Sequence, residues 1–252
     1  MDLNSTSTNK FKIGISYALA IFTFIAFVVF VVLRQTSQLR FSGYEDYSDL
    51  IFGGFLNTIL LSLIALTGSM ILGFLFYLMQ KSNLKYFNAM DDIFTEIIYG
   101  TPLLVLIIIM AFLIGPSFNI SNFNYMGILA IIIYMAPYMK NVFKSGFSSI
   151  SDEQYMAMDL FGFTSFQRYF YILIPQVTRI IMPPLMNNFS LIIKGSALLY
   201  VISFPELFQN ILSAQSRNYL YVEGYLLLWL LYLIITIPLS RLTKLIERKW
   251  SL

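Results

Sequence analysis

Residues 151–175 read SDEQYMAMDLFGFTSFQRYFYILIP, and this stretch predicts a short helix with a signal at each end. Ser151 can accept a hydrogen bond from the backbone N–H of Gln154, whose side chain can reach back, as in a capping box. The two acidic residues between them lie in the first turn, where the helix dipole favours negative charge. Gly162 is a natural left-handed stop. We therefore expect a helix over residues 152–161, about 15 Å long at 1.5 Å per residue.

The same capping pattern recurs directly after this helix. Thr164 and Gln167 have the spacing of a second capping box, so another helix starts there and runs through Pro175. The first helix is apolar beyond its first turn, with Tyr155, Met156, Met158, Leu160 and Phe161. A helix of this composition must bury a face. It either lies on the span ends of its own chain or on lipid headgroups, or it docks into a groove on another protein.

The composition indicates a polytopic membrane protein. Of the 252 residues, 58% are hydrophobic and 12% are charged, and the mean hydropathy is +0.74. Soluble domains carry about 25% charged residues, so this chain has too little charge to cover a surface that faces water. The sequence contains no cysteine and no histidine, so it lacks thiolate chemistry and the commonest general base and metal ligand. A soluble enzyme is nearly excluded, and we expect no catalytic or metal-binding residues.

Gaps between charged residues predict six membrane-spanning helices, since each needs about 20 mostly apolar residues. The uncharged stretch between Glu96 and Lys140 is expected to hold two spans, separated at Gly115-Pro116. The first span is too long for the core of a signal peptide, and no small-residue cleavage site follows it. The expected spans are Ile13–Leu33, Ile51–Met79, about Ile97–Ile114, about Tyr125–Met139, about Ile172–Ile193, and Val222–Leu239.

Lysine and arginine residues predict the orientation, because loops in the cytoplasm carry the excess of positive charge. With both termini in the cytoplasm, eleven such residues lie inside and four outside, and Arg179 lies within a span. The net charge of +3 then reflects orientation, and no basic and aromatic array suggests a nucleic-acid partner. The inner set is Lys10, Lys12, Lys81, Lys85, Lys140, Lys144, Arg168, Arg241, Lys244, Arg248 and Lys249; the outer set is Arg34, Arg40, Lys194 and Arg217.

The sequence lacks the motifs by which a transporter would power itself. No glycine is followed by lysine, so there is no G-x-x-x-x-G-K-[ST] phosphate loop. The spans contain no carboxylate pair of the kind expected in proton- or sodium-driven carriers, and the potassium-filter sequence T-V-G-Y-G is missing. If transport needs energy, a partner must supply it.

Polar residues cluster in the fifth expected span and are candidates for lining a transport pathway. Pro183-Pro184 and Gly195 predict that this helix is broken, and broken helices at mid-membrane are typical of transporter sites. The alternative is ordinary hydrogen bonding within or between helices. The residues that we place on the pathway are Thr101, Asn187, Lys194 and Ser196.

The loop between the fourth and fifth spans has an informative spacing. Met156-Ala157-Met158 is followed after three residues by Gly162 and, after nine more, by Ile172-Leu173-Ile174-Pro175. This spacing resembles, without a gap, the loop E-A-A, three residues, G, nine residues, I-x-L-P of the permease subunits of bacterial ABC importers. One Ala, the Gly, the Ile and the Pro match, whereas the Glu and the second Ala are changed.

Other short motifs over residues 50–245 are similar to those of the polar amino-acid permeases of the histidine, glutamine and arginine type. Single matches are weak, but these occur in the order and at the spacing of that family. They are Gly54–Leu63 for G-x-x-x-T-L-x-L-S-L, Gly100–Val105 for R-G-T-P-L-L-V, Ile174-Pro175-Gln176 for L-P-Q, Lys194–Leu198 for K-D-T-S-L, and Pro205-Glu206-Leu207 for the later E-L.

The resemblance implies an all-α, type I ABC-importer permease fold with about six transmembrane helices, in which helix 152–161 is a cytoplasmic coupling helix. Residues 140–171 are then the coupling loop. Residues 1–49 form the N-terminal tail, first span and an extracellular loop, residues 50–245 the permease domain, and residues 246–252 a cytoplasmic tail. The implied ATPase-coupling residues are Ser151, Gln154, Tyr155, Met156, Ala157, Gly162 and Pro175.

The resemblance also implies the partners and the activity. The chain would pass a polar amino acid or a derivative across the plasma membrane of a bacterium and would itself catalyse nothing. A separate ATPase subunit pair would bind ATP and magnesium, a solute-binding protein would deliver the substrate, and a second permease half would complete the path in the bilayer. Rotation of the coupling helix would rock the attached spans and open either side alternately.

Five departures from the family remove polar or charged groups. They favour a heterodimer whose other half keeps the polar roles. Alternatives are a permease for another small solute such as methionine or a peptide, an autonomous secondary carrier or channel, and a purely structural membrane subunit. The departures are Tyr99 for Arg, Pro137 for Glu, Met156 for Glu, Gly195 for Asp and Ala197 for Ser.

Overall fold

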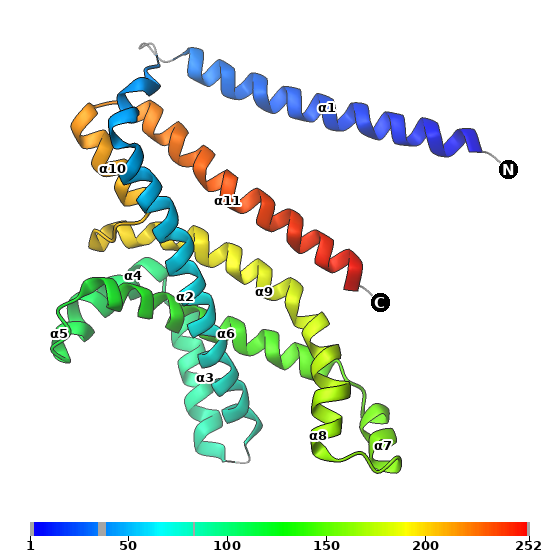
Figure 1. Ribbon diagram of the computed structural model, residues 1–252. Coiled ribbons are helices and arrows are strands. Elements are labelled where there is room, and N and C mark those ends of the chain that lie inside the picture. Colours follow the sequence, from blue (N-terminus) through cyan, green and yellow to red (C-terminus); the bar gives the residue numbers. More distant parts are fainter. Residues whose placement is uncertain (1–2, 35–38, 83, 251–252) are drawn as a thin grey trace. The chain divides into compact units, whose positions relative to one another are not determined.

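The computed structural model describes residues 3–34, 39–82 and 84–250, and their side chains from Gly14 onward. All regular elements in these ranges are helical, as expected for an all-α fold (Figure 1). The chain divides into two units, Met1–Phe41 and Ser42–Leu252. The main helices are α1 (Leu3–Leu33), α2 (Ser48–Lys81), α3 (Lys85–Gly100), α4 (Leu103–Ile109), α5 (Gly115–Ser117), α6 (Phe123–Ser148), α7 (Asp152–Leu160), α8 (Ser165–Gln167), α9 (Ile174–Ser196), α10 (Leu207–Asn218) and α11 (Tyr221–Trp250).

Short π-helical and 3₁₀ segments join several of these helices. The π-helical turns η2 and η3 connect α4 to α5 and α8 to α9, so those segments continue without leaving the helical path. Two 3₁₀ turns, η1 and η4, precede α2 and follow α9. Their bounds are η1 (Phe41–Tyr47), η2 (Met110–Ile114), η3 (Arg168–Leu173) and η4 (Ala197–Ile202).

The first unit consists mainly of α1. The apolar stretch Gly14–Leu33 has a mean hydropathy of 2.7, and none of it is buried. Just beyond it, the Arg34 guanidinium lies over the Phe30 ring, 5.5 Å from the ring centroid. A uniformly apolar and exposed helix of this length is suited to lipid, as expected for the first span.

The count of six spans is confirmed for the described residues. Five helical segments are long and apolar enough to cross a membrane, and a bent pair formed by α3 and α4–α5 brings the number to six. The protein is therefore a multi-pass membrane protein. The unbroken segments are Gly14–Leu33, Phe41–Lys81, Phe123–Ser148, Ser165–Ile202 and Tyr221–Trp250.

The span expected over Ile97–Ile114 is not one helix. The chain bends by 109° between α3 and α4. Thr101 is extended, with φ −103° and ψ 123°, because the ring of Pro102 excludes the α conformation from the residue before it. The Thr101 hydroxyl donates to the Ile97 carbonyl (2.7 Å) and so satisfies one of the freed carbonyls at the bend.

The predicted break at Gly115-Pro116 was also misplaced. Both residues lie inside a helical path that continues through α5, where Pro116 occupies the first turn and needs no N–H partner. The chain turns a few residues later, where Asn119 has a φ of 58° and the side chain of Asn122 caps α6. A proline in the first turn of a helix thus does not end it.

Contrary to expectation, the helix α9 is not broken at Pro183-Pro184. It runs unbroken from Ile174 to Ser196 with both prolines inside it. The chain leaves the α-helical path only after Gly195, through the 3₁₀ turn η4 and the left-handed residue Ser203, which has a φ of 56°. Neighbouring helices that re-satisfy the freed backbone groups make interior prolines tolerable in membrane spans.

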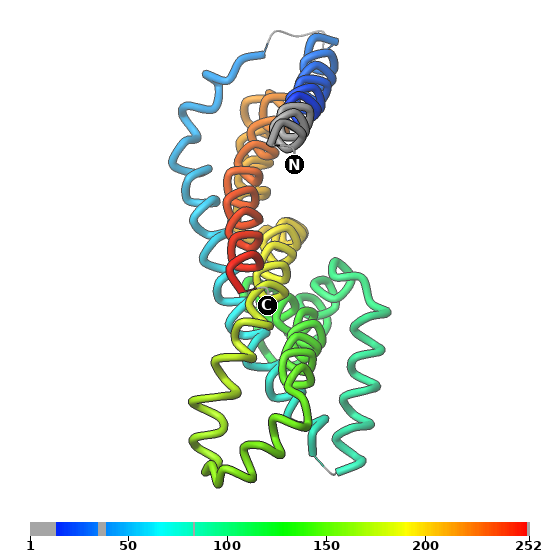
Figure 2. Tube along the Cα trace, turned by 90° about the vertical axis from the view of Figure 1, so that its right-hand side faces the viewer, coloured from blue at the N-terminus to red at the C-terminus, as the bar shows by residue number. Residues whose placement is uncertain are grey.

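Within the second unit, α7 and α8 lie at one end and α10 lies at the opposite end (Figures 1 and 2). The most extensive helix pair is α2 with α6. Gly73 of α2 lies against the Ala136 carbonyl and the Lys140 backbone N–H of α6, so that an added Cβ would lie 2.7 and 2.8 Å from these atoms. Small residues at such contacts let the backbones of membrane helices approach closely.

This contact predicts that Gly73→Ala destabilises the second unit. Because backbone atoms block the new methyl group, we expect a loss of about 1–3 kcal/mol, as for overpacked cores. Thermal unfolding of the purified protein in mild detergent measures it. The matched control is Gly53→Ala, since Gly53 lies on the same helix with no atom near its Cβ position. Equal unfolding temperatures for the two variants would contradict the close α2–α6 contact.

Candidate functional site

The short helix α7 lies where the sequence predicts it, with Ser151 as its cap. The Ser151 hydroxyl accepts from the Gln154 backbone N–H (3.4 Å), which is half of the predicted capping box. Ser151 also hydrogen-bonds the Glu153 carboxylate, and this bond lowers the pKa of Glu153. The serine hydroxyl thus bonds both the Gln154 backbone N–H and the acidic side chain of Glu153 in the first turn.

The far end of α7 is closed by the glycine turn expected from the sequence. Gly162 has a φ of 67°, in the region that side chains rarely adopt. The backbone N–H of Phe163 donates to the Met158 carbonyl (3.1 Å), as at a left-handed helix end. The second capping box is complete, because Thr164 and Gln167 each bond the backbone N–H of the other.

The apolar side chains of α7 divide into an anchored set and a free set. Met158 is 4% exposed and joins the core, and Tyr155 packs against it. Met156, Leu160 and Phe161 are 62%, 88% and 81% exposed. Three large apolar side chains projecting together at the end of a protein mark an interaction surface. We call Met156, Leu160 and Phe161 the docking face.

Arg168 ties the end of α7 to the helix that follows. Its Nε donates to the Phe163 carbonyl (2.9 Å), and its guanidinium forms an ion pair with the Asp159 carboxylate. The arginine therefore links α7 to η3, which leads into α9. The sequence analysis counted Arg168 only as an inner-side charge and missed this link, because the two partners come together only through the turn at Gly162.

A polar groove of about 390 Å³ runs between α9 and α11. It brings together Asn187 and Lys194, two of the four residues predicted to line a pathway. A neighbouring hollow of about 410 Å³ shares Lys194 and Thr236 with it. Lys194 is exposed to the groove, although it lies on a candidate membrane span. The groove is lined by Asn187, Ser190, Leu191, Lys194, Thr236, Ile237, Ser240 and Thr243.

The other two predicted pathway residues lie elsewhere. Ser196 is fully buried and donates to the Ile193 carbonyl (2.8 Å), so it does not line the groove. Thr101 lies at the bend after α3. Pro175 lies in the first turn of α9, away from the glycine turn that closes α7. Of the four residues proposed for the pathway, the structure therefore brings only Asn187 and Lys194 together in the groove.

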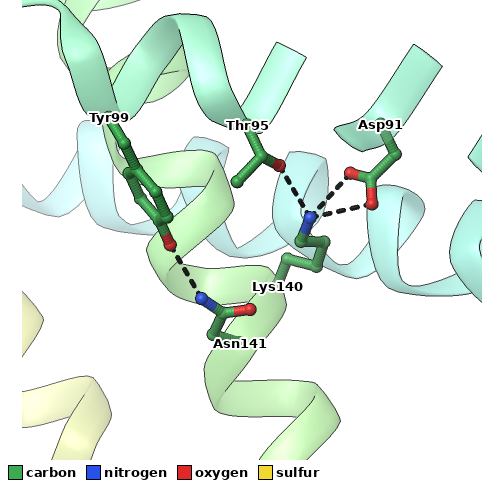
Figure 3. A network of polar contacts seen from close by, with 5 residues as sticks. All are labelled: Asp91, Thr95, Tyr99, Lys140 and Asn141. Atoms are coloured by element: carbon green, nitrogen blue, oxygen red, sulfur yellow. Dashed lines mark hydrogen bonds and ion pairs between the residues drawn. The ribbon is translucent and has the colours of Figure 1, made fainter. Parts of the chain in front are cut away.

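A buried ion pair joins α3 to α6, and the sequence analysis missed it. The Lys140 ammonium donates to both Asp91 carboxylate oxygens (2.9 and 2.8 Å) and to the Thr95 hydroxyl (2.7 Å), as Figure 3 shows. Both charged residues are at most 3% exposed. The next residue of α6, Asn141, donates to the hydroxyl of Tyr99, which lies one turn after Thr95 on α3 (2.7 Å). The spacing of Asp91 and Thr95, four residues apart on one helix face, was the available signal.

A second polar cluster holds α10 against α2 and α11. Glu206 is fully buried and caps α10 by accepting from the Gln209 backbone N–H (2.8 Å). Its carboxylate also accepts from the Tyr232 hydroxyl (2.9 Å) and the Thr58 hydroxyl (3.4 Å). Thr58 bonds the Gly54 carbonyl as well. In the described part of the chain, no three acidic side chains gather as a metal site would require.

This fold and this loop define a class of protein: a multi-pass membrane component with a short apolar helix exposed at one end. Residues 69–252 match the family described as the binding-protein-dependent transport system inner membrane component, and the chain belongs to this family. Its members are permease subunits of ABC transporters rather than enzymes, and they work with an ATPase and a solute-binding protein.

Curated relatives and a solved structure agree with this assignment. The probable glutamine ABC transporter permease protein GlnM of Bacillus subtilis (strain 168) is 30% identical over 84% of this chain and 96% of its own length. The arginine transport system permease protein ArtQ of the same organism is 26% identical over 84% and 97%. A structure titled an amino acid ABC transporter with histidines matches with a TM-score of 0.75 and 28% identity, over 84% of this chain and all of that chain.

The Arg168 link predicts a coupling defect without a folding defect. A partly exposed ion pair contributes only about 0.2–1 kcal/mol, so Arg168→Ala should assemble normally. We expect it to transport fewer substrate molecules per ATP hydrolysed, because α7 can then move without α9. The measurement is the ratio of uptake to ATP hydrolysis in proteoliposomes.

Two further variants are the controls for this prediction. Arg168→Lys keeps the charge but lacks the planar fork of donors, so it should restore coupling only in part. Arg179→Ala removes an exposed arginine from α9 that makes neither contact and should leave the ratio unchanged. An unchanged ratio in Arg168→Ala would show that the link plays no part in coupling.

Proposed function

We propose that the chain is one permease half of an importer that carries a polar amino acid or a close derivative across the plasma membrane of a bacterium. The observation that carries the proposal is the exposed docking face of α7, presented at the spacing of the family's coupling loop. An amphipathic helix of this kind fits a groove on a partner. The partner is a pair of ATPase subunits, which bind ATP and magnesium.

The orientation follows from the cations at the α7 end of the molecule. Lys81 ends α2, Lys85 begins α3, and Lys144 lies near the end of α6, all at the end where Figures 1 and 2 place α7. Positive charge favours the cytoplasmic side. We therefore place α7 and both termini in the cytoplasm and α10 on the outer side. The division into residues 1–49, 50–245 and 246–252 remains a prediction.

The polar groove between α9 and α11 is our proposed part of the substrate pathway. Asn187 and Lys194 supply an amide and a cation on spans that are otherwise apolar, and polar side chains at this depth line cavities rather than lipid. The ammonium is a partner for the carboxylate that every amino acid carries. We also propose Thr101, at the α3–α4 bend, and the buried Ser196 of α9 as residues of the pathway.

The coupling loop supplies the other proposed site. The exposed residue Gln154 faces the ATPase together with the docking face, which includes Met156. The remaining residues hold the loop in shape: Ser151 caps α7, Tyr155 and Ala157 lie on its inner side, Gly162 makes the turn, and Pro175 begins α9.

We propose a different chain as the second permease half. The residues that depart from the family at Tyr99, Pro137 and Gly195 leave this half with fewer polar groups along the path. The lost side chains must then come from the partner half. A homodimer, a related solute such as methionine or a peptide, and an ATPase-independent carrier are the alternatives, and the following measurement separates them.

Native mass spectrometry of the complex, purified through a tag in mild detergent, tests the assembly. The proposal predicts two ATPase subunits, one copy of this chain and one different permease chain. Two copies of this chain with the ATPase pair would contradict the heterodimer. A chain that still transports without any ATPase would contradict the importer itself.

Uptake of labelled amino acids tests the pathway. In Lys194→Met we expect the substrate to be taken up with roughly ten- to hundredfold lower efficiency, since a charged hydrogen bond is worth about 1.5–3 kcal/mol. Lys244→Met is the matched control, because Lys244 is an exposed lysine of α11 that does not line the groove. Equal uptake by both variants would remove Lys194 from the pathway.

A further inference from the structure

An apolar groove lies between α2, α6 and the start of α9, away from the polar groove. Its volume is about 460 Å³, and it is walled mainly by aromatic and aliphatic side chains. Thr178 of α9 is exposed on its wall. The lining residues are Phe74, Tyr77, Leu78, Lys81, Phe143, Phe147, Tyr169, Ile174, Val177, Thr178 and Ile181. Neither the docking face nor the proposed pathway uses this groove.

A polar hollow of about 680 Å³ adjoins the apolar groove, next to α7. Tyr77, Lys81 and Phe147 line both spaces. The rings of Tyr77 and Phe147 stack, with centroids 5.3 Å apart and planes inclined by 10°, and form the shared wall. The rest of the hollow is polar, with Gln80, Lys144, Ser148, Asp152 and Tyr155 among its residues. Together the two spaces form one site with an apolar and a polar half.

The polar half has an excess of positive charge. Lys81 and Lys144 are both exposed, and among the described residues neither forms an ion pair. Asp152 is the acidic residue on the wall, so two cations face one carboxylate. Gln80, Ser148 and Tyr155 add neutral donors. The polar half is therefore suited to an anion.

We propose that an anionic glycerophospholipid occupies this site, with its phosphate between Lys81 and Lys144 and an acyl chain in the apolar groove. The inference rests on the proposed function, which places α7 in the cytoplasm. Lys81 is the first charged residue after the uncharged run that follows Asp49, and this places the polar half at headgroup depth in our proposal. The leaflet on that side carries anionic lipids, and lysines at its surface attract them. A free anion would leave the apolar half unfilled.

The position of the site gives the lipid a structural consequence. Asp152 and Tyr155 belong to α7, whereas Lys81 ends α2 and Lys144 lies on α6. A headgroup bound here therefore touches the coupling helix and two spans at once. The lipid would brace α7 against the ends of α2 and α6.

Lipid retention by the intact transporter complex tests the proposal. The complex is purified in detergent, incubated with phosphatidylglycerol or phosphatidylcholine, and analysed by native mass spectrometry. We expect preferential binding of phosphatidylglycerol, roughly thirtyfold weaker in Lys81→Gln/Lys144→Gln. The matched control is Lys85→Gln/Lys244→Gln, which removes two exposed lysines that line neither space.

A second variant tests the apolar half without changing charge. Thr178→Trp fills the groove from its wall and should also release phosphatidylglycerol, whereas Thr178→Ser should not. Equal retention in the test and control variants would overturn the proposal. Displacement of the lipid by inorganic phosphate or ATP at equal concentration would overturn it as well, because a soluble anion would then be the occupant.

ATP-driven uptake, measured on the same preparations, separates this proposal from the proposed function. Uptake without lysine-dependent lipid retention would refute the lipid site alone. Lysine-dependent retention in a complex that takes up no amino acid would refute the proposed substrate alone. If another part of the protein such as α1 filled the groove, every variant would retain the same small amount of phosphatidylglycerol. That result would also overturn the lipid site.

Discussion

Every backbone polar group inside a bilayer must find a partner within the protein, and this requirement governs the structure. The spans are helices for that reason. Where a helix is interrupted, nearby groups form hydrogen bonds with the backbone groups that the interruption leaves free. At the α3–α4 bend the Thr101 hydroxyl bonds a freed carbonyl. After η4, the Phe204 N–H donates to the Leu199 carbonyl across the left-handed Ser203. Glu206 then caps α10 from a fully buried position.

The helix α9 runs without a break between the two proposed sites. Within the bilayer its backbone polar groups must be bonded inside the protein. The helix carries two prolines yet runs unbroken from Ile174 to Ser196. Its first residues follow η3, which Arg168 ties to α7, and Lys194 lies near its other end. About 30 Å of helix separates Pro175 from Lys194 at 1.5 Å per residue. A displacement of α7 by a partner subunit can therefore reach the polar groove through one continuous helix.

The sequence predicted the features that depend on local rules. The apolar stretches, the α7 helix with its Ser151 cap, the Gly162 turn and the second capping box are all set by neighbours within a few residues. The sequence analysis failed where local and long-range effects compete. Pro183-Pro184 was expected to break α9, and Thr101-Pro102 was expected to lie within one span, although packing helps to decide which proline a helix tolerates.

The long-range polar contacts could not be read from the sequence for a different reason. The Asp91–Lys140 pair joins residues of α3 and α6, and the chain gives no sign of which helices meet. The polar groove was half predicted: Asn187 and Lys194 share a face of α9, but Thr236, Ser240 and Thr243 come from α11. Ser196 is buried, which the sequence did not indicate, because its neighbour Gly195 suggested a break that would expose it.

Protection of a single cysteine tests most directly whether α7 docks on an ATPase. The chain has no cysteine of its own, so Leu160→Cys offers the only thiol on this subunit. Leu160 is 88% exposed on the docking face, and Tyr86, at the same end of the molecule, is 71% exposed and serves as the control position. The account predicts that bound ATPase slows maleimide labelling at Leu160→Cys but not at Tyr86→Cys. Equal labelling of Leu160→Cys with and without the ATPase would contradict it.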